Sequence, residues 1–116
     1  MKKRVLVVED ESLLALDIAD QLVNAGYDVV GPATSVKMAQ RLIGAEGCDA
    51  AVLDVNLGNE TVDPVAFNLQ ERGIPFFFLS GNSREQVPAA LRDYLWLSKP
   101  VSQPMLLEAL LRCMPH

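Results

Sequence analysis

The chain has 116 residues, of which 50% are hydrophobic and 22% are charged, and this is the size and balance of one globular domain spanning residues 1–116. Its formal net charge of −5 argues against a nucleic-acid partner, because a surface that follows phosphates is basic. The first apolar run ends at Val8 and is too short for a signal peptide or a membrane span, so we expect a cytoplasmic protein without membrane contact.

Strand and helix signals alternate from one end of the chain to the other. Short apolar runs predict five strands, over residues 5–8, 27–30, 50–53, 74–79 and 94–97. Apolar residues recurring every three or four positions predict five helices, which begin at or near Ser12, Ser35, Asp63, Ser83 and Ser102. Gly31-Pro32 should end the second strand, and Pro88 should shorten or kink the helix over 83–92. The repeats imply an α/β fold, a doubly wound parallel sheet with helices on both faces.

Polar side chains follow four of the predicted strands: Glu9 and Asp10 the first, Asp54 the third, Ser80 the fourth and Lys99 the fifth. The carboxyl ends of parallel strands share one rim of the sheet, which is where ligands of open α/β sheets bind. Converging carboxylates repel each other unless a cation joins them, and oxygen ligands with room for water suit Mg²⁺ or Mn²⁺. Such a rim suits phosphoryl transfer with Asp54 as the nucleophile, although each residue alone is more often a helix cap or a surface charge.

Four stretches, LVVEDE, VLDVNLG, FFLSGN and LSKP, resemble the receiver domain of two-component response regulators, and the resemblance covers the whole chain. It implies a flavodoxin-like (βα)5 fold whose five-stranded parallel sheet has the order 2-1-3-4-5. It implies Asp54 as the phosphoacceptor, and Glu9 and Asp10 as the acidic pair. It implies that Asp10, Asp54 and the backbone carbonyl of Asn56 are the metal ligands. It also implies Ser80 as the switch hydroxyl, Lys99 as the phosphate-sensing lysine, and a cis peptide bond before Pro100.

The chain departs from the family's usual pattern in places. Trp96 stands where the family usually has Tyr or Phe, which puts the usual aromatic switch in question. Pro88 makes the fourth predicted helix irregular, and the loop after Asp54 lacks the common Met-Pro. The loop sequences are similar to those of small stand-alone receivers associated with HWE-type sensor kinases. In the family, the lifetime of the phosphoryl group is tied to the positions of Asn56 and Asn82.

The resemblance implies a stand-alone response regulator without an output domain, which accepts a phosphoryl group from a histidine kinase or a phosphotransfer protein and is not a turnover enzyme. Phosphorylation would bias a surface made of the fourth helix, the fifth strand and the fifth helix toward an unknown downstream protein, and the same face could form a homodimer. A phosphate-sink role stays open.

Two alternatives belong to other classes. One is a pseudo-receiver that binds a partner without phosphorylation, against which the intact Asp10, Asp54, Ser80 and Lys99 argue. The other is an aspartyl-phosphate phosphatase similar to haloacid dehalogenases, which need a second Asp where this chain has Asn56.

Overall fold

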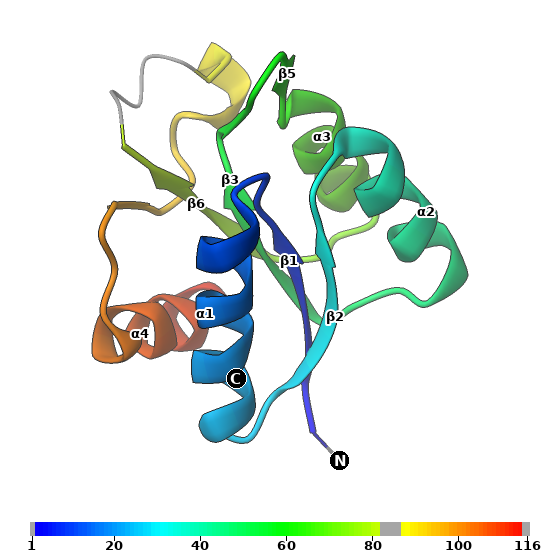
Figure 1. Cartoon of the computed structure of the whole chain (residues 1–116). Coiled ribbons are helices and arrows are strands. Elements are labelled where there is room, and N and C mark those ends of the chain that lie inside the picture. Colours follow the sequence, from blue (N-terminus) through cyan, green and yellow to red (C-terminus); the bar gives the residue numbers. More distant parts are fainter. Residues whose placement is uncertain (1, 82–86, 115–116) are drawn as a thin grey trace.

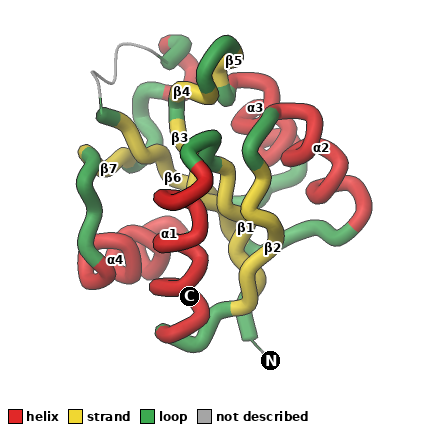
Figure 2. The backbone as a smooth tube through the Cα atoms, in the orientation of Figure 1, coloured by secondary structure: helices red, strands yellow, loops and turns green. Residues whose placement is uncertain are grey.

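The computed structural model describes residues 2–81 and 87–114, and in these ranges a five-stranded sheet lies between two layers of helices (Figures 1 and 2). Its strands are β1 (Arg4–Val8), β2 (Asp28–Ala33), β3 (Ala50–Asp54), β6 (Phe76–Ser80) and β7 (Trp96–Ser98). All neighbouring strands are parallel, in the order β2-β1-β3-β6-β7. The predicted order 2-1-3-4-5 and the flavodoxin-like fold are therefore confirmed.

The helices cover both faces of the sheet (Figure 1). One face carries α1 (Ser12–Asn24) and α4 (Gln103–Cys113), and the other carries α2 (Val36–Ala45), α3 (Asp63–Glu71) and the short 3-10 helix η2 (Ala89–Leu91). Successive strand residues point to opposite faces, so Val5 and Val7 pack under α1 and α4 while Leu6 and Val8 pack under α2 and α3. Burial on both faces is the reason why the strands read as continuous apolar runs. Within the described ranges, no helix is long and apolar enough to cross a membrane.

Strand β2 is longer than predicted and runs through Gly31-Pro32 to Ala33. Gly31 has a φ of +93°, and the ladder to β1 shifts register between Leu6 and Val8, so the strand continues past an irregular step. A proline is tolerated here because β2 is an edge strand whose outer side needs no ladder donor. The prediction that this dipeptide ends the strand was wrong.

The region of the fourth predicted helix also differs. Residues 82–86, which include Asn82 and Ser83, where the predicted helix begins, lie outside the described part of the chain. From Val87 onward the helix prediction was wrong, because only the 3-10 turn of η2 follows. Pro88 is extended, with φ −57° and ψ 152°, and the turn closes when Leu91 N–H donates to the Pro88 carbonyl at 2.9 Å.

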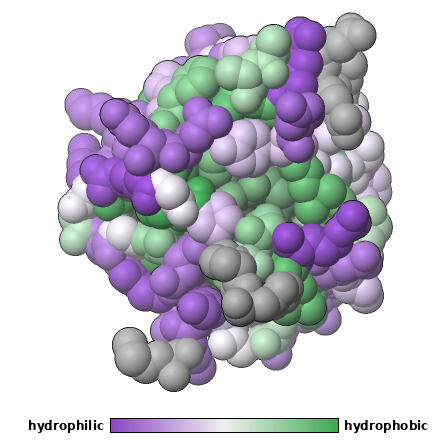
Figure 3. Space-filling model, turned by 180° about the vertical axis from the view of Figure 1, so that it is seen from behind, coloured by the Kyte–Doolittle hydropathy of each residue, from purple (hydrophilic) through white to green (hydrophobic). Residues whose placement is uncertain are grey.

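The outer side of β7 and α4 carries apolar side chains at the surface. An open groove of about 170 Å³ is lined there by the apolar side chains of Leu95, Leu97, Met105 and Ala109 and by the charged side chains of Glu108 and Arg112. We call these residues the β7–α4 face. Figure 3, which views the molecule from behind, shows apolar side chains gathered among hydrophilic ones.

Candidate functional site

The predicted polar residues meet at one rim of the sheet, at the carboxyl ends of the parallel strands. Glu9 and Asp10 follow β1, Asp54 ends β3, Ser80 ends β6 and Lys99 follows β7. These five residues line one open pocket of about 320 Å³ together with Asn56. Strand topology thus brings together positions that lie up to 90 residues apart.

Lys99 bridges two of the carboxylates. Its Nζ donates to Glu9 Oε1 at 2.7 Å and lies 3.2 Å from Asp54 Oδ2. Glu9 is only 1% exposed and Asp54 only 4%, so both charges depend on partners inside the protein. The Lys99 backbone N–H donates to the Ser80 carbonyl at 3.0 Å, which ties the lysine to the end of β6. The peptide bond from Lys99 to Pro100 is cis, as the family resemblance implies.

The crowding of charges shifts two pKa values. Burial raises the pKa of the Glu9 carboxyl above its ordinary value, and the neighbouring Asp54 raises it further. Burial by itself would lower the pKa of Lys99, but the hydrogen bond to Glu9 and the charge of Asp54 outweigh it and raise the pKa. The ammonium group therefore stays charged at neutral pH.

The donor set fits a hard divalent cation. Carboxylate oxygens of Glu9, Asp10 and Asp54 lie within 4.8 Å of one another. Glu9 is already engaged, because it binds Lys99 and accepts the Glu11 N–H at 3.2 Å. Asp10 is exposed and Asp54 lines the same open pocket, so these two offer oxygens to a cation that keeps several waters.

A small hairpin that was not predicted from the sequence follows Asp54. Strands β4 (Asn56–Leu57) and β5 (Glu60–Thr61) are antiparallel and joined through Gly58, whose φ is +71° (Figure 2). A glycine at the first position of a two-residue turn is the signal that could have indicated it.

The hairpin directs the Asn56 backbone toward the rim. At its base Val62 N–H donates to the Val55 carbonyl at 3.2 Å, so by the antiparallel alternation the next pair, Asn56 with Thr61, makes no ladder hydrogen bonds. The Asn56 N–H instead donates to Asp54 Oδ1 at 3.4 Å. Because N–H and C=O of one strand residue point to the same side, we expect the Asn56 carbonyl to face the rim as well.

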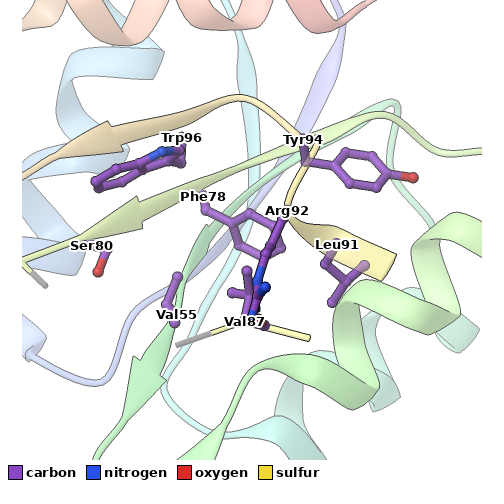
Figure 4. Close-up of a pocket in the computed structure, with 8 residues that line it drawn as sticks. All are labelled: Val55, Phe78, Ser80, Val87, Leu91, Arg92, Tyr94 and Trp96. Atoms are coloured by element: carbon purple, nitrogen blue, oxygen red, sulfur yellow. Dashed lines mark hydrogen bonds between the residues drawn. The ribbon is translucent and has the colours of Figure 1, made fainter. Parts of the chain in front are cut away.

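Behind Ser80 lies a small apolar cavity (Figure 4). Its volume is about 10 Å³, room for roughly one water molecule. Trp96 pairs with Phe78 in the β6–β7 ladder, and its ring lies on the Ser80 side of the cavity, whereas the Tyr94 ring points the other way and stacks on Phe76 at 4.2 Å. An indole is far larger than this space, so Trp96 cannot swing inward unless its neighbours move.

No family model matches the chain. Over 112 residues the chain is 30% identical to the transcriptional regulatory protein PdtaR of Mycobacterium tuberculosis, a match that covers 93% of this chain and 55% of PdtaR. The chain thus spans about half the length of the curated relatives it matches.

Among solved structures, SdrG from Sphingomonas melonis Fr1 is 39% identical with a TM-score of 0.83, and the match covers 95% of this chain and 94% of SdrG. A response regulator from Burkholderia pseudomallei, solved with a phosphorylated aspartic acid, a calcium ion and citrate, is 27% identical with a TM-score of 0.82, covering 94% of this chain and 66% of that one. Other matched structures are CheY-like receiver domains. The chain belongs to the response regulators of two-component signalling, as a CheY-like receiver domain.

Proposed function

We propose that Asp54 accepts a phosphoryl group in a Mg²⁺-dependent transfer from a histidine kinase or a phosphotransfer protein. The observation that carries this proposal is the environment of Asp54, a nearly buried carboxylate at the end of the central strand with Lys99 Nζ at 3.2 Å and Asp10 beside it. The phosphorylated aspartic acid in the Burkholderia response regulator supports it.

The transfer needs positioning and neutralisation of charge more than covalent chemistry. One Asp54 oxygen attacks the phosphorus and forms an acyl phosphate, while the bond from phosphorus to the donor nitrogen breaks and its electron pair stays on the imidazole. The Asn56 N–H holds Asp54 Oδ1, which orients the carboxylate. Lys99 and the Ser80 hydroxyl line the same pocket and can each donate to a phosphoryl oxygen.

Asp10, Asp54 and the Asn56 carbonyl would hold Mg²⁺, with Mn²⁺ as the alternative, and the bound ion would offset the negative charge that otherwise repels the phosphoryl group. Glu9 acts beside them by keeping Lys99 at the rim, through the 2.7 Å hydrogen bond. The phosphoryl group then stays on the protein as a signal, and no other substrate is turned over.

The signal would leave through η2, β7 and α4. The Ser80–Trp96 region and the β7–α4 face share strand β7, so a shift of Ser80 and Lys99 toward the phosphoryl group would reach that face through the β6–β7 ladder. A downstream protein or a second copy of the chain would bind there. Asn56 and Asn82 are the positions proposed to set the lifetime of the phosphoryl group.

The experiment is intact-mass measurement after incubation with acetyl phosphate and Mg²⁺. We expect one phosphoryl adduct, which disappears in Asp54→Asn and after chelation of the metal, and which persists in Asp20→Asn, a matched change at an exposed site on α1. A folded protein that takes up no phosphoryl group from acetyl phosphate would leave two explanations: a donor restricted to a kinase or phosphotransfer protein, or a module that binds its partner without phosphorylation. Sedimentation velocity with and without the adduct tests the homodimer.

A further inference from the structure

The β4–β5 hairpin is fastened to helix α2 by one side chain. Glu60 Oε2, on β5, accepts a hydrogen bond from the Val36 backbone N–H at 3.2 Å. Val36 is the first residue of α2, and its N–H has no partner within the helix. Ser35, the N-cap, accepts the Met38 N–H at 3.1 Å and so satisfies a different donor. A carboxylate at a helix N-terminus is also favoured by the helix dipole.

We propose that Glu60 is a positioning residue for the cation site, because it holds the hairpin that carries the Asn56 carbonyl and the Gly58 turn against the rim. This inference rests on the proposed function, in which Asp10, Asp54 and the Asn56 carbonyl hold the cation.

Glu60 is connected to the site through the pairing of β5 with β4. Glu60 pairs with Leu57 and Thr61 pairs with Asn56, so a shift of β5 moves the residue whose carbonyl faces the rim. Strands of two residues are marginal by themselves and need outside support. Leu57 is 4% exposed and supplies that support on the core side, and Glu60 supplies it at the surface.

The turn also borders the proposed ligand Asp10. A Cβ added to Gly58 would lie 3.4 Å from Asp10 Oδ2, so the turn backbone is one wall of the space around this carboxylate. Release of Glu60 from Val36 would therefore loosen both the Asn56 carbonyl and the wall beside Asp10.

The test is the Mg²⁺ affinity of Glu60→Ala, measured by calorimetry on the unphosphorylated chain. We expect affinity to fall roughly 2- to 5-fold, the range that one exposed contact at a helix N-terminus allows. Glu60→Gln keeps an acceptor oxygen and should keep most of the affinity. Ser35→Ala removes the other side-chain cap of α2 without touching the hairpin, so it should lower the melting temperature but leave the Mg²⁺ affinity unchanged.

Unchanged affinity in Glu60→Ala, or an equal loss in Ser35→Ala, would overturn the inference and leave the proposed function standing. Asp10→Asn separates the two. This variant should no longer bind Mg²⁺ at this site. If it binds the ion as the unmodified chain does, or if the unmodified chain binds no Mg²⁺, both the proposed cation site and the role of Glu60 are refuted.

Discussion

Replacing Lys99 with methionine should destabilise the metal-free protein. Within the described residues, the ion pairs of Glu9 and of Asp54 both run to Lys99 Nζ, at 2.7 and 3.2 Å. Methionine keeps most of the apolar stem and removes the charge. The substitution therefore leaves two nearly buried carboxylates facing Asp10 without a cation.

Loss of one partner from a buried ion pair costs about 3–5 kcal/mol. The Lys99 side chain is 23% exposed, and water in the open pocket screens part of the interaction, so we expect the free energy of unfolding to fall by about 2–3 kcal/mol. For a chain of this length that is a melting temperature lower by roughly 10 °C. Added Mg²⁺ should restore more stability to Lys99→Met than it adds to the unmodified protein, because the ion replaces the missing positive charge.

The pH dependence of the stability lost in Lys99→Met follows from the protonation of Glu9. Its pKa is already raised by burial and is held down in part by Lys99, so removal of the lysine raises it further. A carboxyl whose pKa is higher in the folded state binds protons more tightly there, and stability then falls as the pH rises through that pKa. The deficit of Lys99→Met should thus be large at neutral pH and shrink as the pH falls toward the ordinary carboxyl range.

The assay is urea unfolding at low salt with a chelator, then with Mg²⁺. Lys37→Met, at an exposed position on α2, is the matched control and should change stability by less than about 0.5 kcal/mol. A loss in Lys99→Met no larger than in this control would refute the reasoning that Lys99 neutralises the carboxylates.

Three further predictions concern the acids, the backbone and the thiols. Asp54→Asn removes one negative charge from the cluster and should raise the free energy of unfolding of the metal-free chain by about 1 kcal/mol, and a lower value in urea unfolding would contradict this. Gly31→Ala would place a Cβ 2.7 Å from a backbone nitrogen at a φ of +93° and should lower the free energy of unfolding by at least about 1–2 kcal/mol. Gly44→Ala, in open space within α2, should instead raise it by about 0.5 kcal/mol, and thermal melts of both variants test the pair. Burial raises the pKa values of Cys48 and Cys113 to about 11, so iodoacetamide at pH 8 should modify the native chain far more slowly than the denatured one, and equal rates would contradict the burial of these thiols.

The secondary elements that sequence predicts well are those buried on both faces. Phe76 to Phe78 form an apolar run because alternate side chains enter opposite cores. The prediction failed where local backbone geometry decides. Gly31 lets β2 pass an irregular step, Pro88 leaves room only for a 3-10 turn after it, and a hairpin of two-residue strands carries too few residues to show a period.

The site was predictable as a set of positions but not as a set of contacts. Parallel strands bring Asp10, Asp54 and Lys99 to one rim whatever their rotamers. The sequence does not indicate that Glu9 rather than Asp10 accepts the hydrogen bond from Lys99, since that depends on which carboxylate is buried. Nor does any spacing connect Glu60 with Val36, because the contact joins a strand and a helix N-terminus 24 residues apart.

The charge balance at the rim explains why these contacts matter together. Three carboxylates face one ammonium group, so Lys99 reduces the repulsion without cancelling it; burial raises the pKa of Glu9 most, and the neighbouring Asp54 adds to that rise. A rim left negative favours the binding of a divalent cation, which would offset the charge that repels a phosphoryl group. Under the proposed function, a cation held by Asp10 and Asp54 would take over part of the charge compensation of Asp54, so Lys99 Nζ would be able to donate to a phosphoryl oxygen while its hydrogen bond to Glu9 keeps it at the rim. In this proposal the same lysine would stabilise the resting site and would contact the phosphoryl group once Asp54 carries it.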